Sequence, residues 1–203
     1  MYSSLLPLTI GLFLLRKQKC LEFRLLLSFA TLLVIHEAAG YLTVYMGTRN
    51  NIWLSHLFTP LESGVLAAIY YFNFRKPWMR RGIEIGWVAL VLVSIYDAYM
   101  LGGITQMNSA PKMMANALLI LLAIAYFYKV ANDRNIIYLD SNPVFLLSCA
   151  VLIYYSGTSM SYALFNQALA VSYDAARICL AIVLILNILF NTSQAFILKR
   201  MAA

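Results

Sequence analysis

The sequence predicts an all-α membrane protein: a bundle of seven transmembrane helices with the N-terminus outside and the C-terminus in the cytoplasm. Of its 203 residues, 63% are hydrophobic and only 11% are charged, whereas about a quarter of the residues of soluble domains are charged. The hydrophobic residues gather in long segments, and the basic residues gather between them. A lipid bilayer is therefore the expected surrounding of most of the chain.

The apolar segments are bounded by residues that are typical of helix ends. Asn51 precedes the third segment, Gly102 and Gly103 follow the fourth, and Pro143 opens the sixth. The first segment contains Pro7 and is the weakest candidate span, because a helix of its length rises only about 20 Å, while the hydrocarbon core is about 30 Å thick. Within one domain, residues 1–203, the expected helices cover residues 3–15, 25–47, 52–74, 83–101, 111–131, 143–168 and 172–199.

The Lys and Arg residues indicate the orientation, because the cytoplasmic loops of membrane proteins are enriched in them. Of the 15, three lie in one set of alternate connections, namely Arg49, Lys112 and Arg177, and the other twelve lie in the second set. The second set comprises Arg16, Lys17, Lys19, Arg24, Arg75, Lys76, Arg80, Arg81, Lys129, Arg134, Lys199 and Arg200. The C-terminal side is therefore predicted to face the cytoplasm. Because the net charge of +7 gathers at helix ends, no nucleic-acid partner is expected.

Five ionisable side chains lie inside the expected helices: His36, Glu37, His56, Glu62 and Asp97. Hydrocarbon offers them no hydrogen-bond partner, so each must be paired, neutralised or in contact with water. The predicted topology places all five at the midplane of the membrane or in its outer half. We expect them to converge on one enclosed chamber that is reached from outside.

Polar residues on neighbouring helices extend this expected chamber. Tyr155, Ser159 and Tyr162 follow one another at i, i+4 and i+7 on the sixth helix and share a face. Asn187 and Asn191 begin a second polar stripe on the seventh. Such residues also serve as ordinary hydrogen bonds between membrane helices, and this alternative stays open. The expected ligand-binding residues are His36, Glu37, Tyr41, His56, Thr59, Glu62, Asp97, Tyr155, Ser159 and Tyr162.

No catalytic residue, metal site or cofactor is expected. The cysteines, Cys20, Cys149 and Cys179, lack the spacing of metal-binding motifs. A lipid-acting zinc hydrolase would have to combine His36, His56 and one carboxylate. Membrane hydrolases of seven helices resemble a pattern of three histidines with Asp and Ser, and this chain has two histidines. The hydrolase is therefore kept as an alternative only.

A resemblance rests on three stretches: "WLSHLFTPLE" of the third helix, "LLSCAVLIYYSGT" of the sixth and "LILNILFNTSQAFIL" of the seventh. With the seven-helix layout, they resemble a group of uncharacterised bacterial integral membrane proteins. Those proteins are similar in layout to the seven-helix sensory modules of bacterial receptor kinases and cyclases. The resemblance implies a multi-pass protein of the bacterial inner membrane and no known catalytic residues.

The favoured hypothesis is a receptor-like sensor that binds a small molecule or lipid, or responds to protons. Receptor modules of this kind continue into a cytoplasmic output domain, whereas this chain stops at Ala203. A signal is therefore expected to pass to a separate protein partner. The alternatives are a subunit of a larger membrane complex and, less favoured, a carrier, because paired broken helices are absent from the pattern. A retinal protein is disfavoured because Lys199 is the only lysine of the seventh helix.

Overall fold

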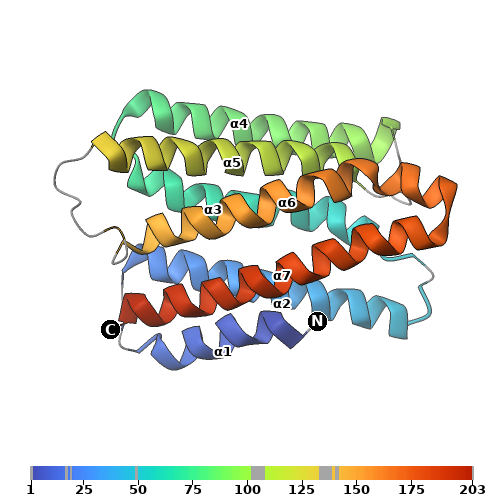
Figure 1. Ribbon diagram of the computed structural model, residues 1–203, viewed down its shortest axis with the longest axis horizontal. Coiled ribbons are helices and arrows are strands. Elements are labelled where there is room, and N and C mark those ends of the chain that lie inside the picture. The colour runs from blue at the N-terminus through green and yellow to red at the C-terminus, as the bar shows by residue number, and fades with distance from the viewer. Residues whose placement is uncertain are drawn as a thin grey trace.

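The computed structural model describes residues 2–16, 18, 20–48, 50–101, 108–132, 139 and 142–202. Within them the chain is all-α, as predicted, and forms an elongated bundle of seven α-helices (Figure 1). The elements are the 3-10 turn η1 (Tyr2–Ser4), α1 (Leu5–Leu14), α2 (Leu21–Tyr45), α3 (Trp53–Asn73), α4 (Pro77–Tyr96), the π-helical turn η2 (Asp97–Leu101), α5 (Ser109–Asn132), α6 (Pro143–Val171) and α7 (Tyr173–Ala202).

Five helices in the described ranges are long and apolar enough to cross a membrane, where the sequence predicted seven spans. They are Leu21–Tyr45, Pro77–Met100, Ser109–Asn132, Pro143–Val171 and Tyr173–Ala202. With its 10 residues, α1 rises only about 15 Å, which is half of a hydrocarbon core. The 21 residues of α3 include a polar first half. The chain is thus a multi-pass membrane protein.

Two helices begin at least one turn earlier than the apolar pattern indicates. α4 begins at Pro77 instead of residue 83, and α2 begins at Leu21 instead of residue 25. Proline is well suited to the first position of a helix because its backbone angle is already helical. The added turns carry Arg80 and Arg24. Because these charged residues interrupt the apolar pattern, the pattern places both helix starts too late, although a helix tolerates such residues outside the hydrocarbon.

Five helices form a ring, and two lie outside it. Around the ring, α2 packs against α3, α3 against α5, α5 against α6, α6 against α7, and α7 against α2. Outside the ring, α1 packs against α2 and α7, whereas α4 packs against α3 and α5. The polar helix α3 therefore contacts three neighbours, which leaves little of its polar half for lipid.

The hydrophobic core fills only the half of the ring that lies near the C-terminus. It combines the start of α2 and α6 with the second half of α3, α5 and α7, as Leu26, Leu66, Ala123, Leu147 and Leu198 show, all of them fully buried. Across this half, the hydroxyls of Tyr70 and Ser148 lie 3.2 Å apart and join α3 to α6. Space for a site remains in the other half of the ring.

The filled half also carries the basic residues. Figure 1 shows that α2 and α6 begin, and α3, α5 and α7 end, on the side of the C-terminus. The described basic residues at these helix ends are Arg16, Arg24, Arg75, Lys76, Arg80, Arg81, Lys129, Lys199 and Arg200. The opposite end of the described chain carries Lys112 and Arg177. The bundle is therefore polarised along its length.

A close approach joins α3 to α4. The indole Nε1 of Trp87 donates a hydrogen bond to the carbonyl of Pro60 at 2.9 Å. The Trp87 ring also lies against Gly64, where a Cβ atom would come within 2.6 Å of Nε1. Only glycine leaves room for the ring at this position.

Candidate functional site

His36 of α2 and Glu62 of α3 form a hydrogen-bonded pair inside the open half of the ring. The His36 Nδ1 atom lies 2.8 Å from Oε1 of Glu62, and the two side chains are 30% and 21% exposed. The imidazole also stacks on the Phe58 ring, with a centroid distance of 4.4 Å and an interplanar angle of 1°. Both groups are thus held in place while one side of each stays accessible.

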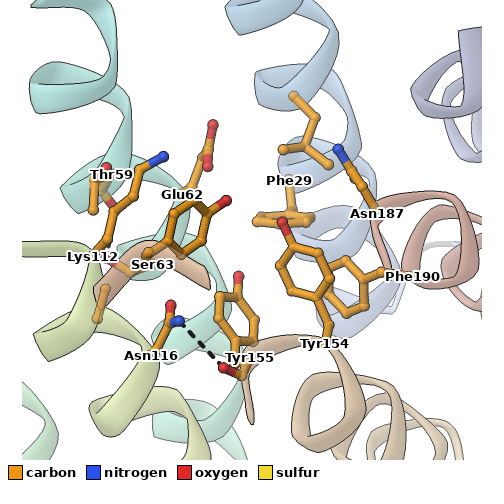
Figure 2. Close-up of a pocket in the computed structure, with 13 residues that line it drawn as sticks. Phe29, Thr59, Glu62, Ser63, Lys112, Asn116, Tyr154, Tyr155, Asn187 and Phe190 are labelled. Carbon is orange, nitrogen blue, oxygen red and sulfur yellow. Dashed lines mark hydrogen bonds between the residues drawn. The ribbon is translucent and has the colours of Figure 1, made fainter. Parts of the chain in front are cut away.

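The accessible side faces a cavity with a volume of about 520 Å³. A deeper recess of about 60 Å³ continues it toward the core, and both are lined by Glu62, Lys112, Tyr154, Tyr162 and Asn187. The lining residues come from all five helices of the ring. Figure 2 shows the polar ends of Glu62, Lys112, Tyr154 and Asn187 directed into the space between these helices. One polar cavity is therefore built from residues far apart in sequence.

The cavity wall carries charges of both signs. On α2, Glu37 lines the cavity and accepts a hydrogen bond of 2.6 Å from the Ser4 hydroxyl. On α5, the Lys112 ammonium lies 4.3 Å from the centre of the Tyr162 ring, a cation–π contact. In the described part of the chain no carboxylate forms an ion pair with Lys112. Its charge is directed to the cavity.

Aromatic rings close the floor of the cavity. Tyr154 stacks on Phe190 with centroids 4.6 Å apart, and Tyr155 and Phe29 meet the same ring edge to face. The Phe29 and Phe190 side chains are almost fully buried. This floor separates the cavity from the hydrophobic core and leaves access from the opposite end of the bundle.

His56 and Asp97 form a second, separate pair outside the cavity lining. Nδ1 of His56 lies 3.7 Å from Oδ2 of Asp97, and both side chains are more than nine-tenths buried. Asp97 begins η2, a π-helical turn that continues α4. The structure therefore divides the five predicted ionisable residues between two places, instead of bringing them to one chamber.

The remaining predicted residues lie at or beside the cavity. Tyr41 and Tyr162 line the wider part, whereas Thr59 and Tyr155 line the recess. Ser159 lies behind it and accepts a hydrogen bond of 3.1 Å from Asn116, whose amide also donates to the Tyr155 carbonyl, drawn as a dashed line in Figure 2. Ser159 therefore has a structural contact, as the interhelical alternative expected.

Several lining residues were missing from the predicted site, among them Lys112, Asn116, Tyr154 and Asn187. By sequence, Lys112 is a cation of a connection between helices, and Asn187 belongs to the predicted polar stripe of the seventh helix. Tyr154 directly precedes Tyr155, which belongs to the predicted polar stripe of α6. A polar residue next to such a stripe is easily assigned to another face of the helix.

Asn108 joins the start of α5 to the first half of α3. Its fully buried amide donates to the Ser55 carbonyl at 3.0 Å and to the Thr59 hydroxyl at 2.9 Å, and it accepts from the Ser55 hydroxyl at 2.8 Å. We expect Asn108→Ala to lower the free energy of unfolding by about 2 kcal/mol, since it leaves several buried groups unpaired.

Detergent-induced unfolding in mixed micelles measures this change. The matched control is Asn132→Ala, because Asn132 is exposed and its amide donates to the Tyr128 carbonyl of its own helix. The control should stay within about 0.5 kcal/mol of the wild type. Equal losses in both variants would contradict a joining role for Asn108.

A two-histidine zinc site does not form among these residues. It requires His36 and His56 to meet one carboxylate, yet each histidine pairs with a different one. The part of the chain that the structure describes contains no group of three His, Cys, Asp or Glu side chains able to hold a metal ion. The donor set thus does not fit the hydrolase alternative.

The chain matches no family model, no curated protein and no solved structure. What these comparisons and the helices support is a multi-helix membrane protein with five long apolar helices.

Proposed function

We propose that this protein is a receptor-like membrane protein whose ring cavity binds a small molecule. One observation carries the proposal: ionisable side chains from α2, α3 and α5 line a cavity of about 520 Å³, which is within the usual range of ligand pockets. Ionisable groups among membrane helices are costly and are usually functional. The cavity thus accounts for residues that packing alone would disfavour.

The alternative of purely structural hydrogen bonds fits other polar residues better. Ser148, Asn116 and Asn108 are almost fully buried and are hydrogen-bonded to neighbouring helices. Glu62 and His36 differ from them, because each keeps an exposed fraction on the cavity side. Partial exposure into a shared space favours a ligand site over a structural contact.

The proposed orientation has the basic end of the bundle in the cytoplasm of a bacterial cell and the cavity facing outward. Arg80 and Lys199 illustrate the basic end, and the enrichment of such residues in cytoplasmic loops supports this placement. Helices α2 to α7 then cross the inner membrane, while α1 enters it halfway from the cytoplasmic side. The expectation of an outside N-terminus is not part of the proposal, since α1 is too short to cross.

Binding is proposed to be reported to a separate membrane or cytoplasmic partner. The layout resembles that of sensory modules, and the lining residues come from five helices. A ligand in contact with all of them would change how these helices pack, which is a change that a partner at the basic end can detect.

The test is native mass spectrometry of the full chain purified from its own membranes. We expect the wild type to retain a small-molecule adduct. In the Glu62→Gln variant the occupancy of this adduct should be at least about 10-fold lower, because the change removes a charged partner of His36 and of the ligand. The matched control is Glu84→Gln on the exposed outer side of α4. Absence of an adduct from the wild type, or equal occupancy in all three proteins, would overturn the proposal.

A further inference from the structure

The seam between α2 and α7 is covered by α1 only in the half of the bundle near the C-terminus. The turn η1 marks the end of this cover: Ser3 accepts a hydrogen bond of 3.0 Å from Asn191 of α7, and Ser4 donates one of 2.6 Å to Glu37 of α2. Figure 1 shows the N-terminus near the middle of the bundle and α2 and α7 diverging beyond it. Above η1, the seam is therefore uncovered.

One face of α7 changes from polar to apolar at the level of η1. Asn191 and Asn187 lie on it, the first fully buried and the second lining the cavity. Three and seven residues before Asn187, on the same face, come Leu184 and Leu180. They are 50% and 49% exposed. The face that forms the cavity wall thus continues as an exposed apolar strip.

The cavity reaches the same opening from α2. Glu37 and Tyr41 line it one turn apart, and the Tyr41 side chain is 51% exposed. A residue that lines a cavity and is also widely exposed marks its mouth. The mouth is thus flanked by Tyr41 of α2 and lies beside the apolar strip of α7, so a polar cavity and a lipid-facing surface adjoin.

The charges of the cavity define the group that fits inside. Glu37 of α2 and Lys112 of α5 line it from helices that are not neighbours in the ring, because α3 lies between them. A ligand that satisfies both carries an ammonium and an anionic group. Glu62 is paired with His36, whereas Glu37 accepts a hydrogen bond from the neutral Ser4 hydroxyl and forms no ion pair among the described residues.

We infer that the cavity binds a membrane lipid with a zwitterionic headgroup, whose ammonium meets Glu37, whose anionic group meets Lys112, and whose acyl chain leaves between α2 and α7 along Leu184 and Leu180. This inference rests on the proposed function, since it names the ligand class of the same cavity. A lipid reaches the site sideways from the bilayer, without passing through water.

The test titrates the full chain in maltoside micelles with dilauroyl phosphatidylethanolamine and, in parallel, with dilauroyl phosphatidylglycerol and with soluble phosphoethanolamine. Native mass spectrometry counts the bound molecules. We expect phosphatidylethanolamine to bind at least about 10-fold more tightly than either comparator, because only it supplies both charges and the chain. Lys112→Met and Glu37→Gln should each remove this preference, whereas Lys112→Arg should keep it. Lys76→Met and Glu84→Gln, at exposed positions, are the matched controls.

Each result separates this inference from the proposed function. If phosphoethanolamine binds as tightly as the lipid, the cavity remains a ligand site. The entry of the ligand sideways from the bilayer would then be overturned. Equal binding of both lipids, unchanged in Lys112→Met and Glu37→Gln, would show unspecific surface lipid and overturn the headgroup assignment. If the wild type shows a native adduct that is not a zwitterionic lipid, the lipid inference fails alone. If the wild type carries no native adduct and shows no preference for phosphatidylethanolamine, both the lipid inference and the proposed function fail.

Discussion

Replacing Gly64 by leucine is expected to lower the free energy of unfolding by about 3 kcal/mol, through overpacking and a lost hydrogen bond. The new Cβ atom would lie 2.6 Å from Nε1 of Trp87. The indole cannot withdraw without breaking its bond to the Pro60 carbonyl. The Pro60 carbonyl and the Trp87 indole N–H would then lack hydrogen-bond partners, and the surrounding hydrocarbon offers none.

The control for this variant is Gly82→Leu in α4, because a Cβ atom at Gly82 meets nothing within 4 Å. There the change should be neutral, or stabilising by up to about 0.8 kcal/mol from helix propensity. Detergent-induced unfolding of both variants in mixed micelles gives the comparison. A Gly64→Leu variant as stable as Gly82→Leu would mean that α3 and α4 do not meet as described.

The helices followed from the sequence because hydrophobic segments and their end residues are local features. The shortness of α1 also followed, because the first apolar segment is too short to cross a hydrocarbon core. Its place against α2 and α7 did not follow. That information lies in contacts of Ser3 and Ser4 with α7 and α2, which join residues far apart in sequence.

The grouping of the ionisable residues was predicted only in part, for a geometric reason. An α-helix turns about 100° per residue, so residues six apart, such as His56 and Glu62, point about 120° away from each other. They cannot both face one cavity from α3. Accordingly Glu62 meets His36 inside the ring, and His56 meets Asp97 on the side of α4. The angle was available from the sequence, whereas the partners were not.

Lys112 was missed because a lysine near a helix end is normally an indicator of topology. Its long side chain instead reaches the Tyr162 ring. Which way such a chain turns depends on the packing of α5 and α6, and no spacing rule within one helix supplies it. The same holds for Asn187, whose role depends on where the cavity ends.

Reactivity of a cysteine placed at Asn187 is expected to separate the cavity from the lipid-facing surface. The native residues Cys20, Cys149 and Cys179 are first replaced by alanine. Asn187→Cys then faces the cavity, whereas Ile185→Cys, two residues earlier on α7, replaces a side chain that is 60% exposed on the outside of the bundle. A thiol in water forms the reactive thiolate, and a thiol in hydrocarbon does not.

The central claim, a water-accessible polar cavity within the ring of five helices, is tested by adding a membrane-impermeant methanethiosulfonate to intact cells. We predict that Asn187→Cys reacts on the order of 100-fold faster than Ile185→Cys. Reaction of Asn187→Cys only in inverted vesicles would reverse the orientation while keeping the cavity. Equal, slow reaction of both cysteines from either side would contradict the cavity itself.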